Sequence, residues 1–310
     1  DITIVTLRIL KILGKFGSEL QQEFNQLQNT PIKYWKPIIP QLFSRLAHPN
    51  SYIRSQIQLV LSRIAKEYPN DIIYPVLVGG ADIQSESEEL HDLALEIRKE
   101  YPILTQQIKI LMEEFLRMTE LWPEIGLTTL QRIGYQIVKR CDTMKEEYKR
   151  ITEMNIKLSK ESIFEQLKDR YNTIMKLTHI QLENYLETIS RQPETPFEIW
   201  FQKQYLERFK KLLNDFKSSK NYSNPIIGWK PFEKLCEEFG NVISSYKFTL
   251  DTVSPQLTTM NSLVVSMPGY NNNINDEDVV TILSFENSFS VLLTKTKPKK
   301  ITINGNDGKK

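Results

Sequence analysis

A cluster of lysine, threonine and proline residues near the end of the chain could bind phosphate. It reads TKTKPKK, from Thr294 to Lys300. A turn of basic and hydroxyl side chains offers positive charge and hydrogen-bond donors to a polyphosphate, as glycine-rich loops do in other proteins. A solvated basic turn or a nuclear-localisation signal has a similar composition. The cluster alone leaves these hypotheses open, so its structural setting has to decide between them.

Predicted strands frame this cluster. The segments SFSVLLTKT and KKITIN are rich in β-branched and apolar residues, and the turn GNDG follows the second of them. An earlier run, EDVVTILSF, is predicted as a further strand that Asn and Ser turn residues join to SFSVLLTKT. We therefore expect the start of an antiparallel sheet, preceded by a low-complexity connector over residues 268–278.

Helical periodicity dominates the chain up to about residue 256. Apolar residues recur three and four positions apart in 37–48 and again in 52–68, which predicts two amphipathic helices. Pro49 and Asn50 lie where one helix would end and the next would be capped. Because one such hairpin cannot bury its apolar face alone, and DIIYPVLVGG begins another helical segment, an α-solenoid is expected. Ordinary bundle helices are the alternative.

Four long helices are predicted next, and their lengths and separations fit an up-down four-helix bundle. They cover about 103–155, 159–191, 195–219 and 226–252. The start of the third helix is well marked, because Thr195 can cap it, Pro196 suits its first position and Glu198 completes a capping box. The expected fold class is therefore mainly α, with a helical-repeat (HEAT-like or TPR-like) solenoid end, a four-helix bundle and a few final strands.

Composition argues against several function classes. The 310 residues include 40 basic and 38 acidic side chains, a net charge of +2, so no overall charge favours nucleic-acid or membrane-surface binding. No apolar run reaches membrane-spanning length. The first residues lack a basic leader and a cleavage site, so they do not resemble a signal peptide, and the chain looks cut at both ends.

The metal-ligating and nucleophilic residue types are sparse. Cys141 and Cys236 lie in apolar helical patterns, which suits reduced thiols in the cytosol or nucleus. His48, His91 and His179 are far apart and show no metal-ligand spacing, so each is expected at the surface or in a turn. The sequence therefore predicts no metal site and no catalytic residue of its own.

Several motifs follow one another in an order that resembles the phosphatidylinositol 3-kinase-related protein kinases. They are YWKPIIPQLFSRLAHPNSYIRSQIQLVLSRIAKEYPNDIIYPVLVG, MTELWPE, ETPFEIWFQKQY, GWKPFEKL, VSMPG and TKTKPKKITINGNDGK. The resemblance covers essentially the whole chain. It implies the C-terminal part of a helical-repeat FAT domain over 1–110, a rapamycin-binding-type bundle over 111–256, and the start of the catalytic domain's amino-terminal lobe over 257–310. ETPFEIWFQ and TKTKPKK look closer to the branch that acts in nonsense-mediated mRNA decay than to the target-of-rapamycin branch.

The resemblance also implies roles for the terminal hairpin. In this family the hairpin between the first two lobe strands lies over the phosphates of ATP, which binds with Mg²⁺ or Mn²⁺. The phosphate-covering residues would be Thr294, Lys295, Thr296, Lys297, Pro298 and Lys299. Leu292 would point toward the adenine, with an ordinary core leucine as the alternative. Lys309 and Lys310 fall in the following turn and do not match the nucleotide-binding lysine, so the segment is expected to be inactive alone.

A second site is implied in the bundle. In the family a shallow apolar groove between the first and last bundle helices recruits substrates or controls access to the catalytic cleft. The matching residues are Leu121, Trp122, Trp229 and Phe232, with packing in the bundle core as the alternative. The family commonly has a second tryptophan one turn after the first, but this chain has Gly126 there.

The function implied by the resemblance is that of a large serine/threonine protein kinase in mRNA surveillance. Its substrate would be an RNA helicase, adaptor subunits would bind the helical repeats, and neither nucleic acid nor a membrane would be bound directly. The expected location is the cytoplasm, with the nucleus as a further one. A target-of-rapamycin-like kinase and a catalytically dead scaffold of the same superfamily are the alternatives.

Overall fold

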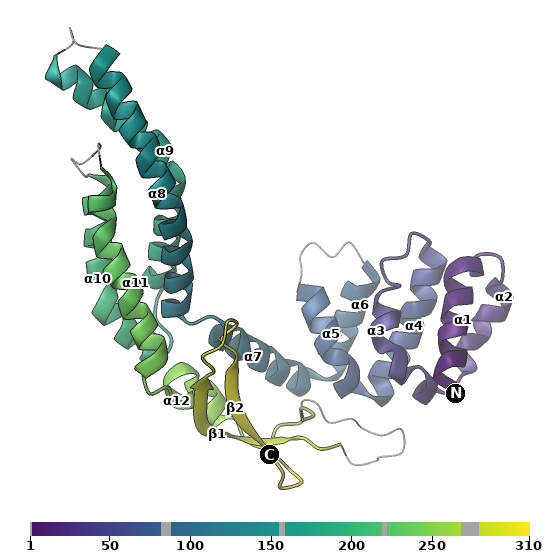
Figure 1. Ribbon diagram of the computed structural model, residues 1–310. Helices are drawn as coiled ribbons and strands as arrows, with labels where there is room; N and C mark the ends of the chain where they lie inside the picture. Colours follow the sequence, from purple (N-terminus) through teal and green to yellow (C-terminus); the bar gives the residue numbers. More distant parts are fainter. Residues whose placement is uncertain (1, 82–87, 155–158, 219–221, 223, 268–278) are drawn as a thin grey trace. The chain divides into compact units, whose positions relative to one another are not determined.

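The computed structural model describes residues 2–81, 88–154, 159–218, 222, 224–267 and 279–310. This part of the chain contains thirteen α-helices and a two-stranded antiparallel sheet, which confirms the mainly helical fold class (Figure 1). The whole connector 268–278 lies outside the described residues.

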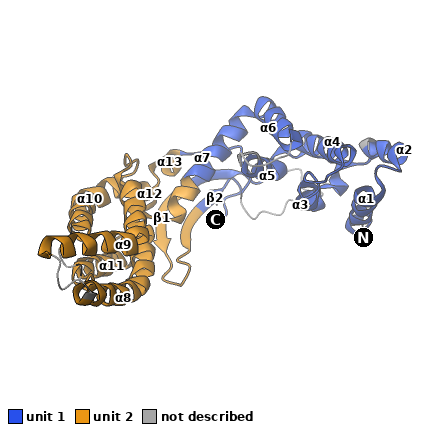
Figure 2. Cartoon of the chain, turned by 90° about the horizontal axis from the view of Figure 1, so that it is seen from above, with its two compact units in different colours: residues 1–113, 260–284, 303–310 blue, residues 114–259, 285–302 orange. Residues whose placement is uncertain are grey.

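The chain divides into two compact units. One comprises residues 1–113, 260–284 and 303–310, and the other comprises residues 114–259 and 285–302 (Figure 2). The domain boundaries expected from the sequence, after residues 110 and 256, lie close to two of these divisions. Each unit also takes up a part of the last fifty residues, which the sequence assigned to a single lobe.

The first unit is built from helix hairpins. Its elements are α1 (Ile2–Phe16), α2 (Gln21–Phe24), α3 (Ile39–Phe43), α4 (Ser51–Glu67), α5 (Pro69–Ala81), α6 (Glu88–Glu100) and the first part of α7 (Pro102–Thr119), with 3-10 turns at Asn25–Asn29, Ile32–Tyr34 and Lys36–Ile38. The predicted cap is confirmed, because Asn50 Oδ1 accepts hydrogen bonds from Tyr52 N at 2.9 Å and from Ile53 N at 3.3 Å.

The helix expected over 37–48 is much shorter than predicted. Only Ile39–Phe43 forms an α-helix, and 3-10 turns precede it. Pro37 and Pro40 lie within this stretch, and a proline has no N–H to donate to a helical hydrogen bond. The apolar periodicity predicted correctly that Ile38, Ile39 and Leu42 are buried. It did not predict the backbone conformation of this stretch.

Extended backbone beyond the bundle belongs to the same unit. An isolated antiparallel bridge joins Ser266 to Thr281, and Leu263 N donates to Ile282 O at 2.8 Å. Asn70 on α5 joins this pairing, since its Oδ1 accepts from Ser266 N at 2.9 Å and its Nδ2 donates to Val264 O at 3.3 Å. The helical repeats and this extended segment are therefore linked by side chain to backbone hydrogen bonds.

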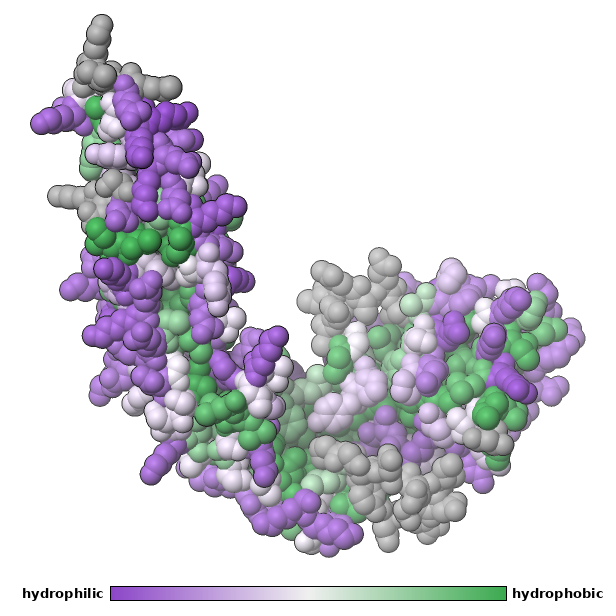
Figure 3. All heavy atoms as spheres, viewed as in Figure 1, coloured by the Kyte–Doolittle hydropathy of each residue, from purple (hydrophilic) through white to green (hydrophobic). Residues whose placement is uncertain are grey.

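The second unit contains the long helices. They are α8 (Trp122–Met154), α9 (Lys160–Ser190), α10 (Pro196–Lys217) and α11 (Ile226–Ser245), followed by the short α12 (Leu250–Val253) and α13 (Pro255–Thr259). The capping box of Thr195 and Glu198 is present as predicted. Charged and polar residues cover much of the face of these helices seen in Figure 3.

One expected helix, over about 103–155, proves to be two. Helix α7 ends at Thr119 and α8 begins at Trp122. Pro123 suits the first turn of a helix but breaks a helix interior. Glu124 Oε2 accepts a hydrogen bond from Leu121 N at 3.1 Å, which satisfies one backbone donor that the start of α8 leaves free.

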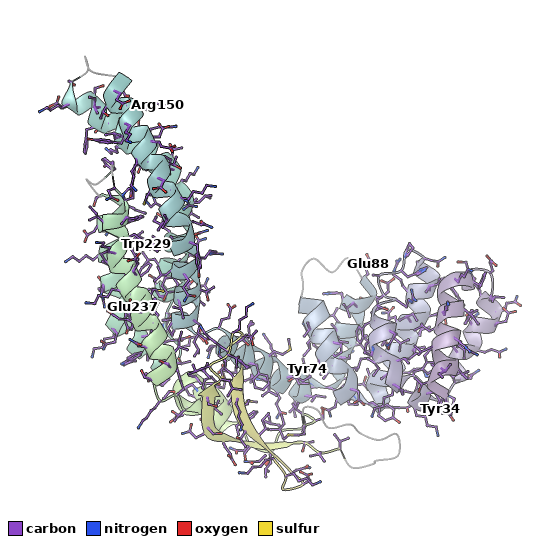
Figure 4. All side chains as sticks on the ribbon, in the orientation of Figure 1. Tyr34, Tyr74, Glu88, Arg150, Trp229 and Glu237 are labelled. Atoms are coloured by element: carbon purple, nitrogen blue, oxygen red, sulfur yellow. The ribbon has the colours of Figure 1, made fainter. Side chains whose placement is uncertain are left out.

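The core of the second unit contains a cluster of aromatic side chains. Trp229 lies on α11 (Figure 4). It stacks on Phe232 with ring centroids 5.1 Å apart, and Phe232 lies 5.7 Å from Phe216. The helices approach closely at Gly126, where an added Cβ would lie 2.4 Å from Tyr185 Oη and 2.5 Å from a ring carbon of Phe239. Only a residue without a side chain fits this crossing.

The two ends of the second unit lie beside each other. Ser254 Oγ donates to Glu114 Oε2 at 2.5 Å, although the two residues are 140 positions apart. Glu114 is 1% exposed, and Arg117 Nη1 donates to its other carboxylate oxygen at 2.8 Å. Since a buried carboxylate needs such partners, this cluster holds the entry and the exit of the unit together.

The sheet consists of β1 (Ile282–Val291) and β2 (Lys299–Gly305). The prediction of two strands joined by a turn near Asn287 was wrong, because β1 is continuous through this region. Polar side chains there are hydrogen-bonded without leaving the strand: Asp251 N donates to Asn287 Oδ1 at 2.9 Å, and Ser288 Oγ donates to Thr302 Oγ1 at 3.0 Å. The predicted hairpin of β1, the TKTKPKK loop and β2 is confirmed.

Candidate functional site

The loop between β1 and β2 has a closed backbone conformation. Leu292 N donates to Pro298 O at 2.9 Å, and Lys297 N donates to Thr294 O at 3.2 Å. Lys297 has φ of 46°, in the left-handed region that costs a residue with a side chain roughly 1–2 kcal/mol. The hydrogen bonds on either side hold this conformation, so the loop has a defined shape.

Four of the predicted loop residues line a pocket of about 370 Å³ with the start of the bundle. The lining consists of Thr119, Glu120, Glu124, Ile125, Thr128, Thr129, Arg132, Lys295, Thr296, Lys297 and Lys299. Leu292, Thr294 and Pro298 do not line it and are exposed on the hairpin. The loop and α8 therefore form one polar site within the second unit.

Three cations in this pocket are available to an anion. Within the described ranges, no ion pair is formed by Lys295, Lys297 or Arg132. The hydroxyl groups of Thr128 and Thr296 lie in the same lining. Hydroxyl donors beside unpaired ammonium and guanidinium groups suit phosphate oxygens, because charge-assisted hydrogen bonds are the stronger ones. The arrangement can hold a polyphosphate.

Lys299 differs from the other lysines of the loop. Its Nζ donates to Glu124 Oε2 at 2.6 Å and to Thr119 O at 3.0 Å. The Lys299 and Glu124 side chains are only 12% and 9% exposed. Removing one partner of a buried ion pair leaves an unpaired buried charge, which typically costs about 3–5 kcal/mol. The Lys299 ammonium is thus already held by the bundle, and its role as a nucleotide ligand stays a prediction.

The four residues of the expected groove do not form one exposed surface. Trp229 and Phe232 are 2% and 0% exposed and pack in the aromatic core, so burial supports the alternative reading for these two. Trp122 packs edge-on against Phe201 at 6.2 Å and, unlike Leu121, lines a second pocket of about 540 Å³. A groove that recruits substrates stays a prediction.

The cysteine and histidine residues form no second site. Both cysteines are free, and burial raises the pKa of the Cys141 thiol to about 11. His179 corrects the expectation of a surface histidine, because it lies between the rings of Tyr171 and Phe216. Burial lowers its pKa. Over the described residues, no group of three or more His, Cys, Asp or Glu side chains could hold a metal ion.

Comparisons with known proteins bear on the family. The model for the HEAT repeats of ATR-like serine/threonine-protein kinases matches residues 20–127. Over 99% of this chain, the sequence is 29% identical to the serine/threonine-protein kinase SMG1 of Danio rerio. Over the whole of this chain, it is 30% identical to the Smg1 kinase of Drosophila melanogaster. It is 28% identical over 98% to the serine/threonine-protein kinase TOR2 of Saccharomyces cerevisiae.

The chain belongs to the phosphatidylinositol 3-kinase-related kinase family. It spans about a tenth of the length of these relatives, as 10% of the Danio rerio and Drosophila melanogaster kinases and 11% of the yeast kinase are matched. The match to the SMG1 kinases runs through both compact units.

The surroundings of Gly126 leave no room for a large side chain. The Tyr185 ring fills the space beside Gly126, and its hydroxyl donates to Trp122 O at 3.1 Å. Tyr185 also packs 5.1 Å from Phe209. A tryptophan at position 126 would overlap these groups.

Sequence reasoning missed Glu124 and Arg132, two charged residues of α8 that line the pocket with the loop lysines. A signal for Glu124 was present, because proline followed by an acidic residue is typical of a first helical turn. No local signal connects either residue to a loop more than 160 positions away. In the described ranges no helix of this kinase segment is long and apolar enough to cross a membrane.

Proposed function

We propose that this chain is the part of a serine/threonine protein kinase that joins the helical repeats to the nucleotide-binding lobe, and that its terminal hairpin covers the phosphates of ATP. The observation that carries the proposal is the closed loop, which brings Lys295, Thr296 and Lys297 into one polar pocket. The kinase names of the relatives support the activity of the whole protein.

The hairpin residues have distinct roles in this proposal. Lys295 and Lys297 supply positive charge, and the Thr294 and Thr296 hydroxyls donate to phosphate oxygens. Pro298 keeps the loop in its turn, and Leu292 contacts the adenine. ATP binds as its complex with Mg²⁺ or Mn²⁺, and residues outside the described hairpin hold the metal, because a loop of lysine and threonine offers it no carboxylate.

We further propose a role in nonsense-mediated mRNA decay, with an RNA helicase as the phosphorylated protein and adaptor subunits on the helical repeats. This part of the proposal rests on the motifs ETPFEIWFQ and TKTKPKK together with the likeness to the SMG1 kinases. The protein would act in the cytoplasm and also in the nucleus. A target-of-rapamycin-like kinase is the second candidate, because the yeast TOR2 kinase is nearly as similar.

A nucleotide titration of the complete protein tests the hairpin. Changing Lys295 and Lys297 together to Ala should weaken ATP binding about tenfold or more, since each lost charge-assisted hydrogen bond is worth about 1.5–3 kcal/mol. The helical region should stay folded, because both side chains lie on the loop. Circular dichroism of the same variant checks this.

Lys300→Ala is the matched control. Lys300 is exposed, follows Lys299 on β2 and does not line the pocket, so its loss should leave ATP affinity unchanged. Unchanged affinity in the Lys295/Lys297 variant would refute the phosphate-covering role. If the complete unmodified protein binds no ATP at all, the scaffold alternative is correct.

A further inference from the structure

The ion pair between Lys299 and Glu124 carries an inference about how the loop is held. Lys299 is the first residue of β2, directly after Pro298, whose carbonyl oxygen accepts from Leu292 N and closes the loop. The position of the Lys299 ammonium therefore fixes where the loop ends. Glu124 lies in the first turn of α8, so the loop is held by the bundle rather than by the hairpin alone.

The surroundings of the pair are complementary to its charges. The ammonium bonds the carbonyl of Thr119, the last residue of α7, and the carboxylate bonds Leu121 N just before α8. A helix favours a cation at its C-terminal end and an anion at its N-terminal end. Lys299 and Glu124 thus match the two helix ends that meet at this junction, and both side chains are nearly buried.

The second carboxylate oxygen indicates that the site is built around the lysine. Glu124 Oε1 is buried, and the described residues offer it no hydrogen-bond partner. Both polar contacts of the carboxylate are made by Oε2 alone, to Leu121 N and to Lys299 Nζ. A buried carboxylate with one unpaired oxygen relies strongly on its remaining partners, so the charge of Lys299 is needed there.

We propose that Glu124 is a positioning residue of the nucleotide site: through Lys299 it holds the phosphate-covering loop against the first bundle helix. Lys295, Thr296 and Lys297 share the pocket with Glu124, so a displacement of Lys299 moves the groups that meet the phosphates. The inference rests on the function proposed above. Lys299 acts in it as the anchor of the loop, not as a phosphate ligand.

The two possible roles of Lys299 predict opposite effects of Glu124→Gln. The amide can still accept from Leu121 N, so the cap of α8 is kept while the charge is lost. If Lys299 were a phosphate ligand, removal of the competing carboxylate would lower the KM for ATP. Because Lys299 anchors the loop, we expect the KM for ATP in the complete kinase to rise about fivefold or more, with kcat less affected.

Amide hydrogen exchange of the complete kinase without nucleotide is the second measurement. In Glu124→Gln the loop residues 293–298 should exchange faster than in the unmodified protein, since the loop has lost its anchor. Lys299→Met should produce the same change. The double variant should be no worse than either single variant, because the two residues act as a pair.

Glu207→Gln is the matched control. It removes the same charge from an exposed helical ion pair, Glu207 with Lys210, on the bundle, and should change neither measurement. A fall or no change in the KM for ATP, or unchanged loop exchange in Glu124→Gln, overturns the positioning role. If the Lys295/Lys297 variant keeps full ATP affinity, both the proposed function and the positioning role are wrong. If that variant loses affinity but Glu124→Gln changes neither measurement, only the positioning role is wrong.

Discussion

The helical-repeat unit and the bundle unit bury different kinds of side chain. Fully buried positions in the first unit are mostly aliphatic, as at Leu13, Ile57, Leu61, Ile64 and Ile73. Those in the second unit mix aliphatic and aromatic residues, and the aromatic ones include Tyr171, Phe201, Phe209, Phe232 and Phe239. Trp35 is the large aromatic exception in the first unit, and its Nε1 donates to Thr30 Oγ1 at 2.8 Å.

The rings of the second unit join particular helices. Phe209 on α10 packs 5.1 Å from Tyr185 on α9 and 5.8 Å from Phe232 on α11. Helix α8 packs against both α9 and α11, and it buries the aliphatic side chains of Ile133 and Ile137 there. Aromatic rings bury a large area per residue, so the contacts of α10 with its two neighbours are the ones that depend on them.

Truncating one core residue in each unit gives the largest effect. Phe232→Ala should lower the free energy of unfolding of the second unit by about 3–5 kcal/mol, and Leu61→Ala that of the first by about 2–5 kcal/mol. Urea unfolding followed by tryptophan fluorescence separates them, because Trp35 belongs to the first unit and the other three tryptophans to the second. If either variant lowers both transitions equally, the units are not independent and the comparison fails.

The glycine at the crossing of the bundle helices gives the next effect. Gly126→Ala should cost about 1–3 kcal/mol, because the added methyl group would overlap Tyr185 and Phe239. Gly240→Ala on α11 is the matched control, since its Cβ would meet nothing within 4 Å. That control should stabilise its helix by roughly 0.5–1 kcal/mol. Thermal unfolding measures both effects. If the melting temperatures of both variants change in the same direction, the close approach at Gly126 is contradicted.

The smallest effect is expected from acidification. Burial lowers the pKa of His179 in the folded bundle, so below its ordinary value of about 6.5 the unfolded chain binds a proton that the folded chain does not. The stability contributed by neutral His179 is complete above that pH and is lost as the pH falls toward the folded pKa. In His179→Gln the free energy of unfolding of the second unit should therefore fall less between pH 7.5 and pH 5.5 than it does in the unmodified protein. Equal losses in both proteins would assign the effect to other groups.

The sequence predicted features that depend on nearby residues. The caps at Asn50 and Thr195 and the hairpin around TKTKPKK were all found as expected, because each is set by residues within a few positions. The strand β1 was predicted with a turn that it lacks. Its Asn and Ser residues are typical of turns, but in the strand Asn287 accepts from Asp251 N and Ser288 donates to Thr302 Oγ1.

Features that depend on distant partners were not predictable. Lys299 was assigned to the phosphates, but Glu124 lies 175 positions away and nothing in either segment indicates their contact. Gly126 was read as a departure from the family, and its close approach to Tyr185 on another helix could not be seen in the sequence. Trp229 could have been exposed or buried, because an aromatic residue at helical spacing suits both a groove and a core.

The hydrogen bond between Ser254 and Glu114 has a consequence for the history of the chain. A segment whose first and last residues touch can be removed or inserted while the backbone on either side keeps its course. The four long helices are such a segment, a cassette between two neighbouring points. The length and sequence of the four helices could differ between relatives. In the laboratory a short linker could replace them, and the elements before and after them would keep their order along the chain.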